Sequence, residues 1–216
     1  MYAFGAQIGN NFPPIELPQP RWDDLAPLGR AIRRRRTDQT FSPESLPRQS
    51  LSDLLWTACG ADRRVDALGA PLQTDATYTQ ARVIDVYVAL EHGLYLYDPE
   101  RMQLVPVLRG DFRSLVAAPD LPRTGDIAPV RLVYVADVNR LEEARSGAAT
   151  ALRDPESQVA CCLVDCGVVA ANVYLFAAAA GLNAWFHDCD RTALAKQMPL
   201  RAGRRVLFGQ TIGYPA

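Results

Sequence analysis

Residues 159–182 read VACCLVDCGVVAANVYLFAAAAGL, and this run decides the fold. It is the most apolar stretch of the chain and is long enough to cross a membrane. However, Asp165 and Asn172 interrupt it, no basic flank accompanies it, and Gly181 is typical of a helix end. We therefore expect a buried helix. Its many Ala, Gly and Cys residues would let its backbone approach another helix closely, as at a subunit interface.

Two apolar segments before this run are typical of strands. Residues 83–90 (VIDVYVAL) are followed by a turn at His92-Gly93 and by residues 94–97 (LYLY), which predicts a hairpin. Residues 130–138 (VRLVYVADV) are almost continuously apolar, which predicts a central strand. After the long helix we expect a short helix over residues 191–198 and a final strand over residues 205–214. The order is mixed α+β with a small sheet.

The N-terminal part begins with a proline-rich arm. Residues 11–20 hold four prolines, so we expect residues 1–24 to be extended and residues 25–216 to form a single domain. Apolar residues at helical spacing predict one helix that runs into Arg33–Arg36 and another over residues 51–58. For the second helix, Ser50 and Asp53 suggest a capping box and Gly60 a stop. Residues 61–82 lack periodicity and are expected to form a long loop.

The composition indicates a folded chain. Of the 216 residues, 49% are hydrophobic and 22% are charged, which excludes collagen-like, disordered and disulfide-scaffold classes. The net charge of −1 gives no general attraction to nucleic acid or to anionic lipid. We therefore expect neither a nucleic acid nor a membrane as a partner, and any anion-binding site must be local.

The five cysteines and two histidines do not form a metal-binding pattern. Cys161, Cys162 and Cys166 lie in the apolar run, where small buried side chains are expected, and neither His92 nor His187 lies beside a cysteine pair. We predict no metal site. Free thiols favour the cytoplasm, and the N-terminus shows no basic region followed by an apolar core. A chain from which a leader had been removed would instead be periplasmic.

The run Arg33–Arg36 followed by Thr37 has two interpretations. It could be the solvated end of a helix, where cations interact well with the helix dipole. It could also be an anion site, because guanidinium groups bind phosphate in pairs and a hydroxyl adds a donor. Classical catalytic motifs are absent, and no carboxylate pair suggests an acid and a base. We nominate no catalytic residue, so the chemistry of an enzyme would come from a cofactor.

Several segments together resemble a known family. Residues 35–41 read RRTDQTF, which is similar to the opening motif of nitroreductases. Further matches, in the family's order, are LLWTA at 54–58, IDVYVAL at 84–90, GLYLYD at 93–98, LVYVAD at 132–137, NVYL at 172–175 and QTIGYP at 210–215. The chain thus resembles the nitroreductase family over residues 25–215, and its SagB-type dehydrogenase branch most closely.

This resemblance implies an α+β nitroreductase-like fold, with a central, mostly antiparallel sheet flanked by helices and the long apolar helix at a dimer interface. It implies a homodimeric flavoprotein with FMN in clefts between subunits. Hydride would pass through flavin N5 between NAD(P)H, or a small substrate, and an acceptor. Arg35 and Arg36 would contact phosphate and ribityl, and Thr37 would donate its hydroxyl. The segment 185–188 would offer a backbone N–H to N5.

Other predicted cofactor-binding residues depart from the family pattern. Gln39 stands where a basic residue is expected, so a cation that would stabilise reduced flavin is missing. Before the first strand, Thr77 keeps a hydroxyl, whereas Gln80 and Arg82 replace Asn and Gln. His187 stands where an Arg is common. Without a basic C-terminal tail, Arg204 or Arg205 would have to help bind the phosphate.

Two functions follow from this pattern. The first is an FMN-dependent oxidoreductase acting as a homodimer on a small-molecule substrate. The alternative is a flavin-free member of the fold whose cleft has degenerated and which acts as a binding or partner subunit. SagB-type relatives act beside other proteins, so a protein partner fits either reading by analogy.

Overall fold

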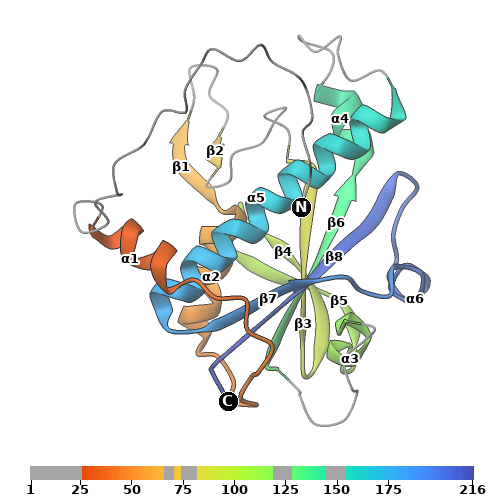
Figure 1. Cartoon of the computed structure of the whole chain (residues 1–216). Coiled ribbons are helices and arrows are strands. Elements are labelled where there is room, and N and C mark those ends of the chain that lie inside the picture. The colour runs from red at the N-terminus through yellow and green to blue at the C-terminus, as the bar shows by residue number, and fades with distance from the viewer. Residues whose placement is uncertain (1–25, 66–70, 74–81, 119–127, 145–153) are drawn as a thin grey trace, which may run out of the picture.

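The structure, a computed structural model, describes residues 26–65, 71–73, 82–118, 128–144 and 154–216 (Figure 1). The N-terminal arm predicted over residues 1–24 lies outside the described residues. The same holds for two predicted cofactor contacts, Thr77 and Gln80.

A six-stranded antiparallel sheet forms the centre of the molecule (Figure 1). Its order is β5-β4-β3-β6-β8-β7, so β6 lies inside the sheet, as the apolar run at 130–138 predicts. The strands are β3 (Ile84–Leu90), β4 (Gly93–Asp98), β5 (Gln103–Arg109), β6 (Val130–Asp137), β7 (Asn183–His187) and β8 (Arg204–Gly213). The predicted α+β class with an antiparallel sheet is confirmed, whereas the two edge strands, β5 and β7, were not predicted.

The segment predicted as a long loop contains two short strands. β1 (Ala61–Val65) pairs antiparallel with β2 (Pro71–Gln73), and they form a separate two-stranded sheet. The prediction of an irregular loop over residues 61–82 is therefore wrong for these strands. Apolar and polar residues do not alternate along these two strands, so the pattern that predicts a half-buried strand is missing from their sequence.

Helices cover both faces of the sheet. On one face lie α1 (Ala26–Arg34), α2 (Arg48–Cys59) and α5 (Pro155–Ala180), and on the other lie α3 (Arg113–Val116) and α6 (Arg191–Gln197) (Figure 1). α4 (Val138–Ala144) continues directly from β6. Because side chains alternate along a strand, every residue of β6 is buried against one layer of helices or the other.

α2 begins earlier than the capping-box pattern predicts. Its N-cap is Pro47, and no side chain caps the helix there. Ser50 therefore lies inside the first turn, and the Asp53 carboxylate accepts a hydrogen bond from Gln49 Nε2 at 2.8 Å instead. The stop at Gly60 is confirmed, with an extended φ of −68°. Glycine is needed there for space, because a Cβ would lie 2.5 Å from the Trp56 ring.

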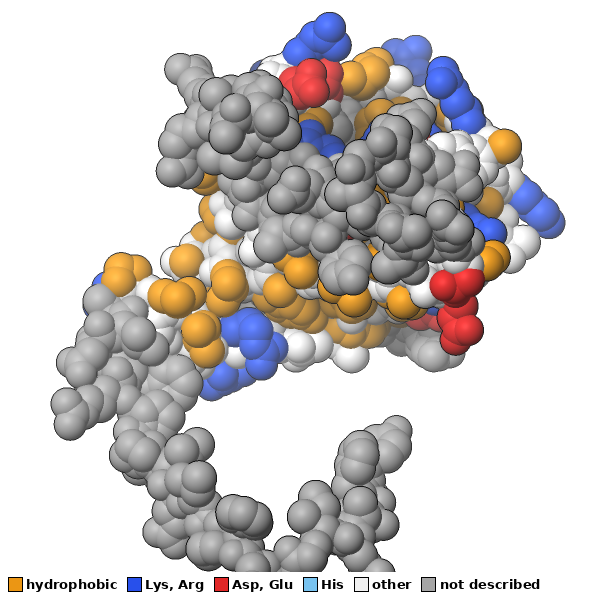
Figure 2. Space-filling view, turned by 90° about the horizontal axis from the view of Figure 1, so that it is seen from above, with side chains coloured by type: hydrophobic (Ala, Val, Ile, Leu, Met, Phe, Trp, Pro, Cys, Tyr) orange, Lys and Arg blue, Asp and Glu red, His pale blue; other side chains and the backbone are white. Residues whose placement is uncertain are grey.

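α5 is buried on one face only. Its length and composition would suit a membrane span, yet 39% of its most apolar window is buried inside the protein. Asn172, which interrupts the apolar run, donates a hydrogen bond from Nδ2 to the Ala58 carbonyl of α2 at 3.3 Å. On the opposite face, Leu163 and Val164 are 42% and 57% exposed. Figure 2 shows hydrophobic side chains in a row along this side of the molecule.

A cluster of four charged residues joins the ends of three strands to α4. Asp85 of β3 and Asp137 of β6 are only 8% and 6% exposed. Arg140 Nη1 lies 2.8 Å from Asp85 Oδ1, and Arg204 Nε lies 3.0 Å from Asp137 Oδ2. Arg204 also reaches Asp85 at 3.4 Å, so each carboxylate faces both guanidinium groups. Two positive and two negative charges therefore compensate each other where water is largely excluded.

We expect Asp137→Ala to lower the free energy of unfolding by about 3–5 kcal/mol, because it leaves Arg140 and Arg204 with a single carboxylate. The control is Arg101→Ala, which breaks a surface pair with Asp98 at 3.3 Å. Its cost should stay within about 1 kcal/mol. Urea denaturation of both variants measures the difference. Equal losses would contradict a structural role for the buried cluster.

Candidate functional site

The outer edge of β7 is paired with the segment that follows α1. β8 occupies one side of β7. On the other side, the Asp38 N–H donates to the Ala184 carbonyl at 3.3 Å, and the Phe186 N–H donates to the Tyr174 hydroxyl at 2.8 Å. The arginine-rich opening motif therefore lies along a sheet edge, next to the C-terminal half of α5.

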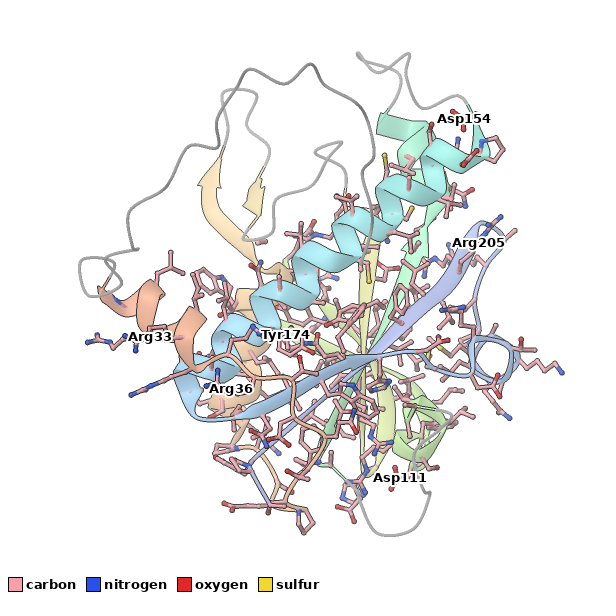
Figure 3. The ribbon with its side chains drawn as sticks, viewed as in Figure 1. Arg33, Arg36, Asp111, Asp154, Tyr174 and Arg205 are labelled. Atoms are coloured by element: carbon pink, nitrogen blue, oxygen red, sulfur yellow. The ribbon has the colours of Figure 1, made fainter. Side chains whose placement is uncertain are left out.

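Tyr174 connects the three elements that meet there. Its hydroxyl lies 3.4 Å from Thr37 Oγ1, and its ring centroid lies 5.8 Å from the Arg35 guanidinium carbon. Arg35 Nη1 in turn donates to Thr37 Oγ1 at 3.4 Å. Figure 3 shows Tyr174 on α5 beside Arg36. Tyr174 is not among the predicted site residues, and its only sequence signal was a hydroxyl in a nearly apolar helix.

The helix-end interpretation of the arginine run applies to its first two residues, and the anion-site interpretation stays a prediction for the last two. Arg33 and Arg34 are in the last turn of α1, where cations suit the helix dipole. Arg35 and Arg36 lie beyond the helix and are exposed together with Thr37. Arg36 Nη1 donates to the carbonyls of Arg33 and Arg35 at 2.9 and 3.1 Å, so part of its donor capacity is used. Two guanidinium groups and a hydroxyl thus face solvent beside β7.

The next residues add no positive charge. Gln39 is exposed. The Asp38 carboxylate accepts hydrogen bonds from the Thr40 N–H and hydroxyl at 2.9 and 2.7 Å, which lowers the pKa of Asp38 and keeps it ionised. Any anion bound here would therefore be held by Arg35, Arg36 and Thr37.

His187 points to the opposite face of the sheet from Tyr174. Its ring is 6% exposed, with Nε2 2.9 Å from Thr211 Oγ1 and Nδ1 2.7 Å from the Asp188 carbonyl. Burial lowers the pKa of His187. A Cβ at Gly209 would lie 2.7 Å from the ring, so this glycine makes room for it. The structure therefore does not bring His187 to the opening motif.

Arg82 is also distant from the opening motif within one subunit. It precedes β3, which is separated from β7 by β6 and β8. Its Nε atom is buried and has no hydrogen-bond partner among the described residues, and its carbonyl accepts from Arg140 Nη1 at 2.9 Å.

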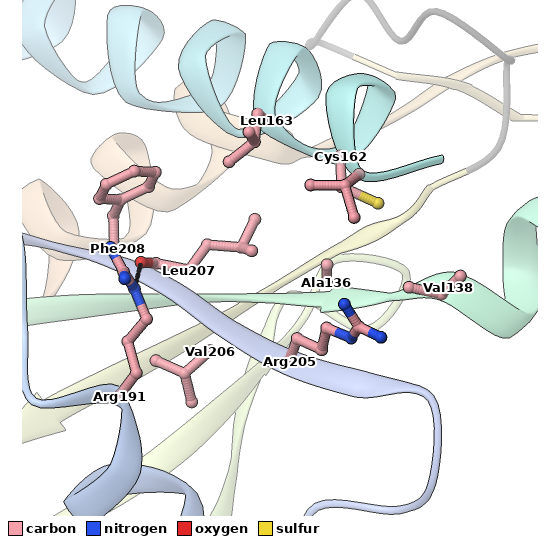
Figure 4. A pocket seen from close by; sticks show the side chains of 10 residues that line it. Ala136, Val138, Cys162, Leu163, Arg191, Arg205, Val206, Leu207 and Phe208 are labelled. Atoms are coloured by element: carbon pink, nitrogen blue, oxygen red, sulfur yellow. Dashed lines mark hydrogen bonds between the residues drawn. The ribbon is translucent and has the colours of Figure 1, made fainter. Parts of the chain in front are cut away.

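A pocket of about 340 Å³ lies between the N-terminal half of α5 and strands β6 and β8 (Figure 4). It is lined mainly by apolar side chains: Ala136, Val138, Val159, Cys162, Leu163, Val206, Leu207 and Phe208. Arg191 and Arg205 add two cations. Arg191 is held by Asp188 Oδ1 at 2.7 Å and by the Leu207 carbonyl at 2.7 Å.

Arg205 and the opening motif lie near opposite ends of α5 (Figure 3). Cys162 lines the pocket and Tyr174 contacts the motif, and a helix rises about 18 Å between these two positions. A single subunit therefore does not bring Arg205 to a phosphate held by Arg35. The role predicted for Arg205 stays a prediction that needs a second subunit.

A pair of aromatic side chains links β7, which Tyr174 contacts, to the pocket. The rings of Phe186 and Phe208 lie 4.9 Å apart, and Phe208 lines the pocket. The subunit thus carries exposed cations and a hydroxyl near one end of α5 and an apolar pocket near the other end. These two surfaces suit the two ends of a ligand with an anionic group and a flat apolar ring system, so the residues present fit a flavin mononucleotide.

The cysteines do not resemble a redox or metal site. All five are buried. Burial raises the pKa of Cys162 to about 11 and that of Cys166 to about 12, so neither forms a thiolate near neutral pH. Within the described residues, no group of three potential metal ligands is found.

Comparison with known proteins identifies relatives. The chain matches the model of the nitroreductase family over residues 32–214. The crystal structure of a candidate nitroreductase from Ralstonia eutropha JMP134 is 32% identical, with a TM-score of 0.74, covering 95% of this chain and 88% of that one. A search among curated proteins found no match.

Two further solved structures share the fold. One is the E. coli microcin synthetase McbBCD complex with truncated pro-MccB17 bound, where the match is 16% identical with a TM-score of 0.70 and covers 99% of this chain and 79% of that one. The other is the NADPH:FMN oxidoreductase from Vibrio harveyi in complex with NAD+, which is 17% identical with a TM-score of 0.58. That match covers 86% of this chain and 67% of the Vibrio chain.

The buried His187 makes stability depend on pH. An unfolded histidine has a pKa near 6.5, whereas burial lowers the pKa of His187 in the folded chain. Below about pH 6.5 the unfolded chain therefore binds a proton that the folded chain resists, and stability falls as the pH drops. We expect His187→Asn to lose less unfolding free energy than the wild type between about pH 7.5 and 5.5. Urea denaturation measures this, and equal losses would count against a neutral His187.

Proposed function

The chain belongs to the nitroreductase family, and on this premise we propose that it is an FMN-dependent oxidoreductase of the SagB-type dehydrogenase branch. The observation that carries the proposal is the cluster of Arg35, Thr37 and Tyr174 at the edge of β7, together with an apolar pocket beside the N-terminal half of α5. The Vibrio harveyi neighbour, an NADPH:FMN oxidoreductase, supports the cofactor and NAD(P)H as a donor.

The opening motif would hold the phosphate and ribityl chain. Arg35 and Arg36 supply charge-assisted hydrogen bonds, and Thr37 supplies a hydroxyl. The aromatic side chains of Phe186 and Phe208 and the pocket beside them offer apolar surface to the ring system. When bound, FMN supplies hydride transfer through N5 between NAD(P)H, or a small substrate, and an acceptor. The protein's own contribution is to bind, orient and exclude water.

Two of the donors predicted to bind the cofactor already have partners within the protein. In segment 185–188 the Phe186 N–H donates to Tyr174 at 2.8 Å, and in the opening motif Arg36 Nη1 donates to backbone carbonyls. These internal contacts favour the second candidate function, a flavin-free partner subunit. The microcin synthetase neighbour, which is part of a protein complex, supports such a role by analogy of fold.

The exposed face of α5 is proposed as a homodimer interface. It presents Leu163 and Val164, and α1 adds Leu28 and Ile32, which are also exposed. Exposed apolar patches mark interaction sites. A two-fold axis crossing the middle of α5 would set the N-terminal half of one helix beside the C-terminal half of the other. The pocket of one copy would then approach the opening motif of its partner.

Flavin binding tests the first proposal. We expect the purified wild type to carry a flavin absorption band or to take up FMN with micromolar affinity. Arg35→Ala combined with Thr37→Val should weaken FMN binding at least about tenfold, because hydrogen bonds to charged groups contribute about 1.5–3 kcal/mol each. The control is Arg33→Ala, whose side chain points away from Tyr174 in Figure 3. Fluorescence titration measures all three proteins.

The same titration separates the two candidate functions. A wild type with no flavin and no saturable uptake of FMN would contradict the oxidoreductase and favour the partner subunit. A similar loss of affinity in Arg33→Ala would show that general positive charge, and not the motif at β7, binds the cofactor.

Size-exclusion chromatography with light scattering tests the interface. We expect the wild type to be a dimer and Val164→Glu to be a monomer, because a buried unpaired carboxylate strongly disfavours association. The control is Val105→Glu, which alters another exposed valine, on the edge strand β5. A Val164→Glu protein that remains dimeric would place the interface elsewhere.

A further inference from the structure

We propose that Tyr174 is a positioning residue that orients the hydroxyl proton of Thr37 toward an anion bound at Arg35 and Arg36. This inference rests on the proposed function, because the anion is taken to be the phosphate of a flavin mononucleotide. The structure carries it through three contacts that Tyr174 makes with β7, Thr37 and Arg35.

The first contact determines the direction of hydrogen bonding. The Phe186 backbone N–H can only donate, so the Tyr174 hydroxyl oxygen accepts from it, at 2.8 Å. Phe186 is in β7, whose other edge is fixed by pairing with β8. The tyrosine oxygen is thereby held at a defined place on the sheet edge, and its own proton remains available for donation.

The second contact joins the Tyr174 hydroxyl to the Thr37 hydroxyl. Without a ligand, Thr37 Oγ1 donates to the Tyr174 hydroxyl at 3.4 Å and accepts from Arg35 Nη1 at 3.4 Å. When a bound anion accepts the threonine proton, the free proton of the Tyr174 hydroxyl can donate to Thr37 in return. With Tyr174 and Arg35 both donating to Thr37, the threonine proton can only point to the anion. Both distances are at the long end for hydrogen bonds, and a bound anion would strengthen the chain by polarising it.

The third contact places the Arg35 guanidinium over the ring of Tyr174. The Arg35 guanidinium lies 5.8 Å from the Tyr174 ring centroid, within the range of cation–π attraction. The ring and the hydroxyl of Tyr174 therefore have separate tasks. The ring helps to hold Arg35, and the hydroxyl orients Thr37, so Tyr174→Phe removes the second task and keeps the first.

A comparison of two ligands isolates the effect on phosphate. FMN and riboflavin differ only by the phosphate group, so a residue that acts through the anion changes their relative affinities. We expect Tyr174→Phe to weaken FMN binding about threefold to tenfold, the range for one neutral hydrogen bond, and to leave riboflavin binding unchanged. Tyr95→Phe, which removes a half-buried tyrosine hydroxyl on β4, is the control and should change neither.

A double-mutant cycle tests whether Tyr174 acts through Thr37. Thr37→Val removes the hydroxyl and keeps the shape of the side chain. If Tyr174 acts only by orienting that hydroxyl, Tyr174→Phe should cost no further FMN affinity in the Thr37→Val background. Additive losses in the double variant would overturn the inference. So would an equal loss of FMN and riboflavin affinity in Tyr174→Phe, which would show a merely structural role.

Hydrogen exchange provides a readout without flavin. We expect the Phe186 amide to exchange faster in Tyr174→Phe than in the wild type when FMN is absent, and unchanged exchange would overturn the inference. The failures are distinguishable. A wild type that binds FMN while Tyr174→Phe keeps the FMN-to-riboflavin ratio refutes only this inference. A wild type that binds no FMN refutes the proposed function, and this inference with it.

Discussion

The outer edge of β7 is the constraint on which the candidate site depends. A strand at the end of a sheet exposes backbone donors and acceptors that need partners. Here the Asp38 N–H and the Tyr174 hydroxyl supply them, to the Ala184 carbonyl and the Phe186 N–H. Satisfying this edge brings the segment after α1 next to the C-terminal half of α5. The arginines that follow α1 are thereby placed over a rigid sheet, which gives them a defined geometry although they are exposed.

α5 has two different tasks on its two faces. One face closes the core against the sheet and α2, and the other exposes Leu163 and Val164. Along its length it also separates two groups of cations, Arg35 and Arg36 near one end and Arg205 near the other (Figure 3). A helix that is apolar on both faces is stable in water only when both are covered. Association of two copies would cover the exposed face and bring the two cation groups together.

The geometry of the sheet places the remaining candidate residues in different parts of the subunit. Side chains of neighbouring residues in β7 point to opposite faces, so Phe186 joins the core under α5 while His187 packs near α3. Sheet order places Arg82 three strands from the opening motif. The spacing of residues in the sequence indicates neither that His187 lies on the other face of the sheet nor that Arg82 lies far from the opening motif. The resemblance to the family could nominate these positions together, but it could not say which of them one subunit brings to the same place.

Sequence alone determined the fold class, the inner strands, the long helix and the arginine motif, because periodicity and apolar runs are local signals. Its failures have physical causes. The capping box at Ser50 was wrong because α2 starts three residues earlier, with Pro47 as its N-cap, and β7 was missed because a short edge strand has no strong pattern. Only the tertiary structure decided that Tyr174 meets Thr37 and that His187 turns away. Those contacts join residues 137 and 24 positions from their partners, and strand pairing and helix packing alone create them.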